Sequence, residues 1–536
     1  MTDIIILAGG DISRKLHFIK SRYISPALIP VSSRILVLYT IDFYKQFKDV
    51  RISLIIEENQ LKNVSNELIH YASYLNIVTV SNASGVVDTL QKALKKLSIE
   101  NDVIINLVTT IPKVFPSINE VQISNEKTDT NVWSSIIVKD DGVEFLGKNK
   151  NHRKPGNAFI GIFRVTKQLL EEALKLTHIK DDLLSVVENM NKLEALKFKE
   201  SEWVDCGHEL KYYDARAKLI SSRSFNRIEV FPEKGILKKS SQNGLKLIAE
   251  EQYMLALPPE LKIYYPRVIK GCSNNKKENC YEIEYYGYPN LSEYFLYWNL
   301  SHENWQRIFD RLEKILKEYS TFSFSIGKNA YTKFYFHKTI ERVEDFRKYL
   351  KDSKKECLWL DSEVFINDKK CLPFNKLAAF IEKKILDLYN EKDFCIMHGD
   401  LCFNNILFDV PTGIVRLIDP RGSFGHDCVG IYGDRKYDIA KLAHSAMGYY
   451  DYFVNDLFQL KNVGLDYEYY INEREAQGYI TELCMKFVDQ MGYEKKDIMF
   501  IVGLLFVSMA SLHNDSYERQ KVMYLHGIKI LNESIE

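Results

Sequence analysis

The chain has 536 residues, with 72 Lys and Arg against 72 Asp and Glu, so its formal net charge is zero. At roughly 100–200 residues per domain, this length predicts about three compact units. Hydrophobic residues make up 46% and charged residues 27%, a globular composition that excludes a disordered chain. Because balanced charges create no long-range field for a polyanion, the composition argues against nucleic-acid binding and against a polybasic membrane-surface protein.

Cysteine usage and the apolar runs predict a cytoplasmic protein without membrane insertion. The nine cysteines are scattered and none forms a CxxC pair, which is typical of a reducing compartment and argues against a disulfide framework or a zinc site. The first residues, MTDIIILAGG, lack a basic region and a small-residue cleavage site, so we expect no signal peptide. The most apolar run, Ile498 to Leu512, is shorter than the roughly 20 residues that a bilayer needs and predicts a buried helix.

Short apolar runs alternate with amphipathic segments in the N-terminal part of the chain. Such an alternation is typical of βαβ units around a buried parallel sheet. The apolar segments are Ile4–Leu7, Ile35–Tyr44, Ile52–Glu57, Ile77–Val80 and Val103–Leu107. The sequence therefore predicts an α/β, Rossmann-like N-terminal domain over residues 1–222.

The pattern changes after this domain. Strand-like alternation at Arg227–Phe231 and Ile236–Leu237 is followed by a helical pattern, Leu245 to Leu257, which two prolines end. Beyond about residue 300 the pattern is mostly helical, with one strand-and-loop interruption at 394–421. We expect a small lobe over 223–295 and a helical lobe over 296–536.

The interruption carries the strongest chemical signal. It reads IMHGDLCFNNILF, followed by VRLIDPRG. Asp400 is followed five residues later by Asn405, and a hairpin strand then ends in Asp419. Phosphoryl transfer needs a carboxylate that accepts the proton of the attacking hydroxyl, and oxygen ligands that hold Mg²⁺ against nucleotide phosphates. Asp400 is the expected catalytic base, and Asn405 and Asp419 are the expected metal ligands.

This HGDxxxxN loop, with the later Ile418-Asp419, resembles the aminoglycoside phosphotransferase and choline kinase family. The resemblance implies a two-lobed, protein-kinase-like α+β domain that uses ATP and Mg²⁺. It also implies that Asp438, in the segment GDRKYDIAKL, braces the catalytic loop, and that His398 is a structural hydrogen-bonding residue.

The same resemblance implies a lysine on a strand and a glutamate on a helix, both before the HGD loop in the sequence. The segment ILKKSS, followed by KLIAEE, fits that requirement. Lys238 and Lys239 lie on opposite faces of a strand, and we favour Lys239 as the residue that meets the nucleotide phosphates. Glu250 is the expected partner, because its spacing to Leu257-Pro258 resembles the family's helix. No glycine-rich loop is present, and the hairpin Phe225–Gly235 is the candidate cover for the phosphates.

A second basic cluster lies at Lys338 and Arg342. At i, i+4 spacing the two cations share one face of a helix. They could meet a phosphate or an anionic substrate. A solvated basic stripe is the simpler interpretation of the same pattern.

The first strand runs directly into Leu7-Ala8-Gly9-Gly10, with Arg14 beyond it and PALIPV at residues 26–31. Strand-to-glycine junctions let backbone N–H groups approach phosphates. Together with NAFIGIF at 157–163 and WVDCGH at 203–208, this arrangement resembles the sugar-phosphate nucleotidyltransferases, including MobA-like enzymes. The resemblance implies nucleotide contacts at Gly9, Gly10 and Arg14, and a metal ligand at Asp205.

Two departures from that family predict a degenerate domain. Ala27 stands where the family has a phosphate-binding lysine, and Thr109 stands where it has the first metal-binding aspartate. Loss of the lysine removes a charged phosphate contact, and loss of the aspartate removes a metal anchor. If Thr109 is assigned one strand too early, the domain could still be active.

The main hypothesis is an ATP- and Mg²⁺-dependent kinase that phosphorylates a small-molecule hydroxyl on a sugar, polyol or amino alcohol. Fusions of this kind resemble proteins that make building blocks for bacterial capsule or lipopolysaccharide. One alternative is a bifunctional kinase and nucleotidyltransferase that makes a nucleotide-activated precursor. Another is a non-catalytic pseudokinase scaffold. The expected partners are nucleotide and substrate, and homo-oligomer formation stays open.

Overall fold

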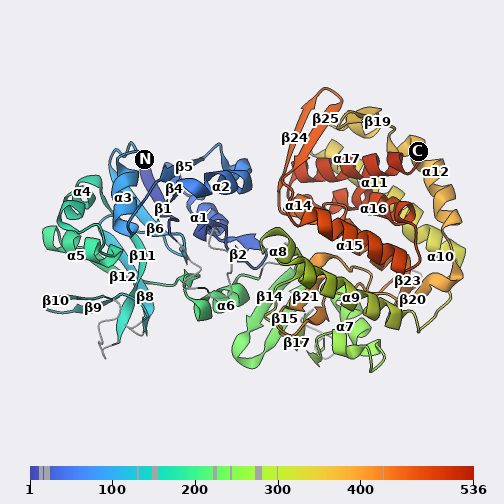
Figure 1. Ribbon diagram of the computed structural model, residues 1–536, viewed down its shortest axis with the longest axis horizontal. Coiled ribbons are helices and arrows are strands. Elements are labelled where there is room, and N and C mark those ends of the chain that lie inside the picture. The colour runs from blue at the N-terminus through green and yellow to red at the C-terminus, as the bar shows by residue number, and fades with distance from the viewer. Residues whose placement is uncertain are drawn as a thin grey trace. The chain divides into compact units, whose positions relative to one another are not determined.

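A mixed sheet of nine strands forms the centre of the N-terminal unit in the computed structural model (Figure 1). The structure describes residues 1–10, 16, 25–128, 132–147, 155–220, 226–241, 244–271, 280–298, 300–425 and 428–535. By its internal contacts the chain divides into two units, Met1–Leu219 and Ile220–Glu536. The domain and lobe limits drawn from the sequence stay predictions.

The N-terminal unit contains strands and helices in alternation. Its strands are β1 (Thr2–Leu7), β2 (Pro30–Val31), β3 (Arg34–Ile35), β4 (Val50–Glu57), β5 (Leu75–Val80), β6 (Asp102–Leu107), β7 (Thr110–Ile111), β8 (Glu120–Thr128), β9 (Ser135–Lys139), β10 (Gly142–Leu146), β11 (Gly156–Thr166), β12 (Lys197–Ser201) and β13 (Val204–Asp205). Its α-helices are α1 (Leu36–Tyr44), α2 (Leu61–Glu67), α3 (Val86–Leu94), α4 (Lys167–Leu176), α5 (Leu183–Leu193) and α6 (Glu209–Lys218).

Four strands of the large sheet are parallel and lie in the order β6-β1-β4-β5. β11 pairs antiparallel with β6 and extends the sheet. The connections from β1 therefore run one way to β4 and β5, and the opposite way to β6. In an open α/β sheet, ligands bind at the carboxyl ends of the strands where the order reverses. In this unit that position is the end of β1 and β6.

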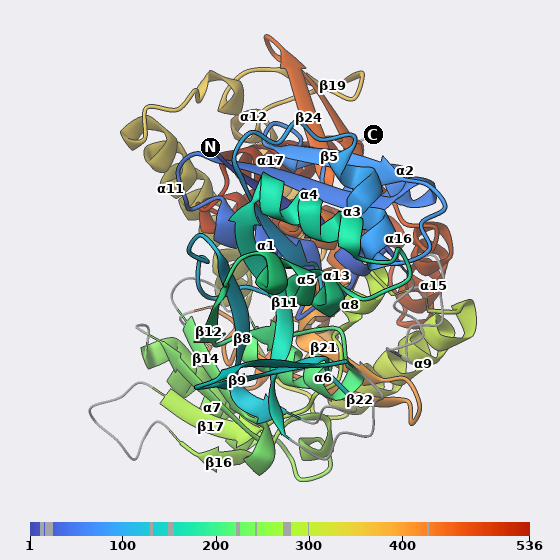
Figure 2. The same cartoon turned by 90° about the vertical axis from the view of Figure 1, so that its left-hand side faces the viewer.

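The parallel strands are covered on both faces. Ile5 and Ile105 belong to one apolar core with side chains of α3, α4 and α5, three helices that lie close together in Figure 2. Ile4 and Ile104 are buried on the other face, where α1 contacts β4. Burial on both faces explains why these strands appear in the sequence as continuous apolar runs. The apolar segment 35–44 is different, because nearly all of it is helix α1.

The C-terminal unit has a small antiparallel sheet followed by a mostly helical region. Its strands are β14 (Asn226–Phe231), β15 (Ile236–Ser241), β16 (Val268–Lys270), β17 (Cys280–Glu284), β18 (Val364–Ile366), β19 (Lys369–Cys371), β20 (Phe394–Ile396), β21 (Ile406–Asp409), β22 (Ile414–Leu417), β23 (Tyr432–Asp434), β24 (Phe458–Val463) and β25 (Asp466–Ile471). Its α-helices are α7 (Gly244–Ala256), α8 (Leu291–Leu296), α9 (His302–Tyr319), α10 (Lys328–Thr332), α11 (Lys338–Asp352), α12 (Phe374–Asp387), α13 (Arg435–Ala446), α14 (Tyr450–Val454), α15 (Gln477–Gln490), α16 (Lys495–Met509) and α17 (Tyr517–Glu533).

The small sheet has the strand order β14-β15-β17-β16. Helix α7 packs against β15, β16 and β17. A short turn at Pro232–Lys234 closes the β14–β15 hairpin, and Gly235 ends it at φ +63°, a left-handed conformation that glycine adopts without steric cost. This hairpin is the segment proposed from the sequence as a phosphate cover, although its first residue, Phe225, lies outside the described residues.

Helix α16 lies at the centre of the helical region. It packs against α11, α13 and α17, and Figure 1 shows it among the red helices α15 to α17. Its side chains from Phe500 to Met509 are all buried, as expected for a helix that is apolar on every side. Among the described residues, no helix combines the length and the hydropathy needed to cross a bilayer.

A second sheet lies within the helical region, where the sequence predicted mostly helix. Its strand order is β19-β18-β25-β24. β24 and β25 form a hairpin around Gly464, which adopts φ +60°. The alternating pattern of DYEYYI in β25, with Tyr467 and Ile471 buried and the intervening residues more exposed, is the signal that predicts a half-buried strand.

Candidate active site

The HGD loop follows directly after β20 and is held by one helix residue. The backbone N–H groups of His398 and Gly399 donate to the two carboxylate oxygens of Asp438 on α13, at 2.7 and 2.8 Å. Burial raises the pKa of Asp438 to about 7. Gly399 adopts φ +79°, and a Cβ there would lie 2.7 Å from Cβ of Arg421. The loop therefore requires glycine at this position, and Asp438 braces the loop as the sequence indicated.

His398 is a structural residue in its neutral form. Its Nδ1 accepts a hydrogen bond from the backbone N–H of Asp400 at 3.2 Å, so Nε2 carries the proton and donates to the carbonyl of Ile418 at 3.0 Å. Burial lowers the pKa of His398 to about 4. The ring therefore joins the residue before Asp419 to the loop that carries Asp400, and it has no free nitrogen for acid–base chemistry.

Asp400 is ionised and held by two neighbours. The Asn405 amide donates to the backbone carbonyl and to the carboxylate of Asp400, at 2.8 and 3.1 Å. The Lys441 ammonium lies 2.8 Å from the other carboxylate oxygen. Burial alone would raise the pKa of Asp400, but the charges of Lys441 and Arg421 hold that pKa well below its usual range. Asp400 is thus a carboxylate that stays charged, with 35% of its side chain exposed.

Lys441 is a site residue that the sequence analysis did not single out. It lies on α13, three residues after Asp438, and residues at this spacing share one face of a helix. Only 4% of its side chain is exposed. The charge of Asp400 outweighs the effect of burial and raises the pKa of Lys441. A lysine one turn after a bracing aspartate was the only signal in the sequence, because its partner lies on a separate loop that precedes β21.

The strand lysine, the helix glutamate and the second aspartate meet at one ammonium group. Lys239 Nζ on β15 lies 2.7 Å from Oε2 of Glu250 on α7 and 3.0 Å from Oδ1 of Asp419. Lys239 and Glu250 are fully buried, whereas 41% of the Asp419 side chain is exposed. Tyr281 on β17 also donates to Glu250, at 2.9 Å. Of the two adjacent lysines, Lys239 makes this contact. Lys238 is half-buried, on the opposite face of the strand.

These charges set the ionisation of the cluster. Burial by itself would raise the pKa of Asp419, but the Lys239 ammonium holds that pKa below its ordinary value. Burial would lower the pKa of Lys239, and the two carboxylates raise it instead. Asp419 also has φ +57°, an uncommon backbone conformation for a residue with a side chain. Such conformations cluster at functional sites.

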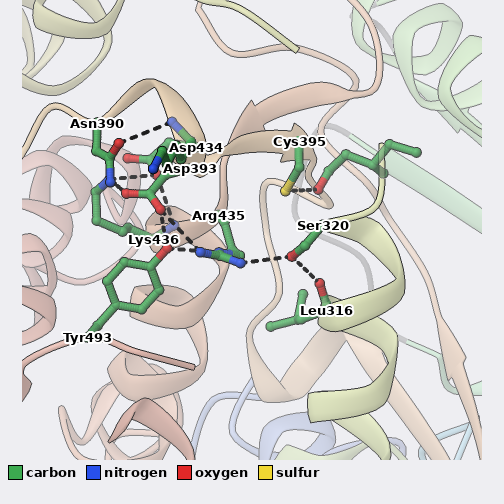
Figure 3. A network of polar contacts seen from close by, with 11 residues as sticks. Leu316, Ser320, Asn390, Asp393, Cys395, Asp434, Arg435, Lys436 and Tyr493 are labelled. Carbon is green, nitrogen blue, oxygen red and sulfur yellow. Dashed lines mark hydrogen bonds and ion pairs between the residues drawn. The ribbon is translucent and has the colours of Figure 1, made fainter. Parts of the chain in front are cut away.

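A buried polar network holds the start of α13. Asp393 accepts from Lys436 Nζ at 2.6 Å, from Arg435 at 3.2 Å and from the Tyr493 hydroxyl at 2.6 Å (Figure 3). Arg435 also donates to Ser320, the residue directly after α9, at 3.0 Å. The network fixes the helix that carries Asp438 and Lys441. It is therefore a support for the candidate site and takes no part in its chemistry.

In the N-terminal unit the expected phosphate loop begins after β1. The backbone N–H of Gly10 donates to the Glu57 carboxylate at 3.2 Å, and Gly10 has φ +98°. Gly9 lies close to Thr89 of α3, because a Cβ at Gly9 would be 3.6 Å from that side chain. The third residue predicted to contact nucleotide, Arg14, lies outside the described residues.

Asp205 lies beside Thr109 at the end of β6. β13 and β7 pair so that Asp205 is opposite Thr110, and the Cys206 N–H donates to the Thr109 carbonyl at 2.8 Å. A Cβ at Gly207 would meet the Thr109 hydroxyl at 3.1 Å and the Asp205 carboxylate at 3.3 Å. Thr109 therefore lies beside Asp205, and its assignment to the family's first aspartate position stays a prediction.

Both oxygens of the Asp205 carboxylate contact protein donors. One oxygen accepts from the Gly207 N–H at 2.7 Å, and the other accepts from the Trp133 indole at 3.0 Å and contacts His208 Nδ1 at 2.6 Å. Ala27 is completely buried. Over the described residues, no cluster of three His, Cys, Asp or Glu residues could hold a metal ion.

No family model and no curated protein sequence matches the chain. Among solved structures, the chain is similar to a Bacillus anthracis protein assigned as a glucose-1-phosphate thymidylyltransferase, with 15% identity over 42% of this chain and 97% of that protein, at a TM-score of 0.36. It is also similar to the nucleoside-diphosphate-sugar pyrophosphorylase from Vibrio cholerae, with 15% identity, 40% and 99% coverage, and a TM-score of 0.32. HddC from Yersinia pseudotuberculosis has 19% identity, 41% and 99% coverage, and a TM-score of 0.31.

These similarities lie in the N-terminal part of the chain. The kinase expectation for the C-terminal unit stays a prediction after the comparisons, and so do the roles of the individual site residues.

Proposed function

We propose that the C-terminal unit is an ATP- and Mg²⁺-dependent phosphotransferase that acts on the hydroxyl group of a small molecule. The observation that carries the proposal is the contact of Lys239 with both Glu250 and Asp419. These three residues come from a strand, a helix and a loop, and the loop is far from the other two along the chain. Asp400 and Asn405 lie on the loop that His398 joins to the residue before Asp419.

The donor set suits Mg²⁺. This ion binds proteins through one or two carboxylate or amide oxygens and takes its other ligands from phosphates and water. Asp419 offers a partly exposed carboxylate, and Asn405 uses its amide nitrogen to bind Asp400, which leaves its amide oxygen for a cation. When bound, the ion would neutralise charge on the nucleotide phosphates.

Three residues of the chain have separate roles in the proposed transfer. Lys239 binds the nucleotide phosphates, and Glu250 orients Lys239. Asp400 accepts the proton of the acceptor hydroxyl as that oxygen forms a bond to the terminal phosphorus of ATP. The bond between this phosphorus and the bridging oxygen breaks, and ADP leaves with that oxygen. Because the pKa of Asp400 lies well below its usual range, the residue is ready to orient the hydroxyl and receives its proton only as the transfer proceeds.

ADP release tests the proposal. The full chain is incubated with ATP, Mg²⁺ and a panel of sugars, polyols, amino alcohols and their phosphates, and acceptor-dependent ADP is measured. The proposal expects at least one acceptor to raise ADP release above the rate without acceptor, and expects chelation of Mg²⁺ to abolish the increase. If no acceptor does so and Mg·ATP does not stabilise the chain against heat, the scaffold alternative replaces this proposal.

A second candidate function is nucleotidyl transfer by the N-terminal unit, which would make the protein bifunctional. The position of Gly9, Gly10 and Asp205 near the ends of β1 and β6 favours it, because ligands bind at such a reversal of strand order. Buried Ala27 and the hydroxyl of Thr109 argue against it. Pyrophosphate release from CTP or UTP, measured with the phosphorylated product of the C-terminal unit, distinguishes the two.

A further inference from the structure

A group of cations lies next to the catalytic loop and has no role in the function proposed so far. Lys338 Nζ lies 3.6 Å from the centre of the Phe334 ring and 5.4 Å from that of Tyr437. The Arg421 guanidinium lies 5.8 and 5.3 Å from the same two rings, and it donates to the Tyr437 hydroxyl at 3.0 Å. Two positive groups therefore share two aromatic rings, which brings them close together.

Arg342 is the third member of the group. It follows Lys338 by four residues on α11, so the two side chains share one face of that helix. Burial and then the charge of Arg421 lower the pKa of Arg342. A π-helical turn, Lys333–His337, directly precedes α11. Turns of this kind occur frequently at functional sites, and this one carries Phe334.

No ion pair joins this group to an acidic side chain among the described residues, although the charges of Asp400 and Asp438 act on Arg421, and those of Asp345 and Glu341 act on Arg342. No carboxylate oxygen there lies within 4.0 Å of Lys338, Arg342 or Arg421. Burial, followed by the charge of Arg421, lowers the pKa of Lys338 well below its usual range. Lys338 is half-buried, whereas the almost fully buried Lys239, Lys436 and Lys441 each contact a carboxylate. Buried charges are normally paired or bound to a ligand.

The group lies beside the expected catalytic base. The backbone N–H of Arg421 donates to the carbonyl of His398 at 2.8 Å. The Arg421 side chain also lies against Gly399, the residue before Asp400, because a Cβ at Gly399 would be 2.7 Å from Cβ of Arg421. An anion bound by this group would consequently lie close to a hydroxyl oriented by Asp400.

We propose that the acceptor carries an anionic group, a phosphate or a carboxylate, that binds Lys338, Arg342 and Arg421 while its hydroxyl meets Asp400. This inference rests on the proposed phosphotransferase function and narrows its substrate class to acidic acceptors. It disfavours an amino alcohol, because three cations would repel an ammonium group. It also separates two tasks, with Lys239 on β15 for the nucleotide and the cation group for the acceptor.

Matched acceptor pairs test the proposal on the full chain. ADP release is measured with glucose and glucose 6-phosphate, glycerol and glycerol 3-phosphate, ribitol and ribitol 5-phosphate, and with glycerate and choline. We expect an acidic member to be preferred over its neutral partner, and choline to be inert. The phosphate and carboxylate arms show which anion is bound. Preference for neutral acceptors or for choline overturns the inference and leaves the phosphotransferase function standing.

Substitutions separate acceptor binding from nucleotide binding. Lys338→Gln and Arg342→Gln should each raise the KM for the acidic acceptor by about tenfold to a hundredfold, the usual effect of losing a charged hydrogen bond. The KM for ATP should change by less than twofold. Lys348→Gln, an exposed position on the same helix, is the matched control and should change neither. A rise in the KM for ATP alone would assign the group to the nucleotide and overturn the inference.

A binding measurement keeps the inference testable without turnover. Inorganic phosphate is added at constant ionic strength, with chloride as the reference anion, and the melting temperature is recorded. Phosphate should stabilise the wild-type chain and the Lys348→Gln variant, and stabilise Arg342→Gln and Lys338→Gln by less than half as much. This result would support an anion site even if no acceptor yields ADP. No stabilisation of the wild type, or equal stabilisation of all four proteins, overturns the inference.

Discussion

The two units differ in how they treat the carboxylates at their candidate sites. In the C-terminal unit, Asp400 and Asp419 each contact a buried lysine and each keep more than a third of the side chain exposed. In the N-terminal unit, Asp205 is buried and accepts from a backbone N–H, an indole and an imidazole. The first arrangement keeps charged oxygens available to a ligand, whereas the second uses its carboxylate to hold protein groups together.

The difference shows that the contacts around a motif's aspartate indicate its function better than the presence of the aspartate in the sequence. In the WVDCGH segment, Asp205 has the hydroxyl of Thr109 beside it, and no second carboxylate is among the described groups that contact it. The HGD segment, in contrast, is contacted by Asp438 and Lys441 of α13 and by Asn405, and its Asp400 stays partly exposed.

The largest effect is expected at Asp400. Asp400→Asn should lower acceptor-dependent ADP release by about a thousandfold, because general-base groups typically contribute factors of about 10²–10⁴. The melting temperature should fall as well, because Asn leaves the buried Lys441 ammonium without its counterion, so turnover is measured below the melting temperature of the variant. Asp387→Asn, an exposed position on α12, is the control. Undiminished turnover of a folded Asp400→Asn variant would contradict the mechanism.

Replacement of Lys239 should affect both activity and stability. Lys239→Met leaves Glu250 buried without its cation, and breaking a buried ion pair costs about 3–5 kcal/mol in free energy of unfolding. The KM for ATP should rise as well. The adjacent substitution Lys238→Met tests the choice of strand face and should change both quantities little. Equal effects at the two positions, in urea unfolding and in kinetics, would show that the face is assigned wrongly.

The free energy of unfolding should fall in acid because of His398. Its pKa in the folded protein is about 4, below the ordinary 6.5, so between these values the unfolded chain binds a proton that the folded chain excludes. The contribution is full above pH 6.5 and is lost as the pH falls towards 4. Asp400, Asp419 and Lys441 contribute charge around this ring.

The test compares the free energy of unfolding of the wild type with that of His398→Gln as a function of pH. The stability of the wild type relative to His398→Gln should fall by about 2–3 kcal/mol from pH 7 to pH 4.5, from 1.36 kcal/mol per pKa unit. His302→Gln, at an exposed position, should show no such trend. A pH-independent difference at residue 398 would mean that the ring has the same pKa in the folded and the unfolded chain.

The smallest effect on phosphotransfer is expected at Asp205. Asp205→Asn should leave ADP release within about twofold, while the loss of one acceptor for a buried donor lowers the stability of the N-terminal unit by about 1–3 kcal/mol. If the wild type releases pyrophosphate from CTP or UTP and Asp205→Asn does not, the N-terminal unit is active. The contrast between the two units would then fail.

Much of the fold follows from local patterns, and the exceptions have physical causes. Burial on both faces makes β1, β4 and β6 continuous apolar runs, which predicts a parallel sheet. A continuous apolar run does not indicate a strand at residues 35–44, because a helix buried against a sheet is also apolar. The β24–β25 hairpin is not predicted, although β25 alternates, because the segments on both sides of it are helical and dominate the pattern.

The candidate site was partly accessible from sequence. Strand alternation separates Lys239 from Lys238, and helix spacing points to Glu250, so the lysine–glutamate contact could be anticipated. The role of Lys441 could not, because its ion pair with Asp400 depends on how α13 packs under a loop from an earlier part of the chain. Periodicity shows which residues share a face of one element. It does not show which elements meet.

The ion pair between Lys239 and Asp419 competes with the binding of ATP and Mg²⁺. The ammonium and the carboxylate at 3.0 Å are the same groups proposed to receive phosphate and metal, so ATP and Mg²⁺ have to replace an existing bond as well as form new ones. If nucleotide bound without metal, its phosphates would bind Lys239, and the Asp419 carboxylate would be left without a counterion. Nucleotide and metal should therefore bind cooperatively, each lowering the cost of separating this pair for the other.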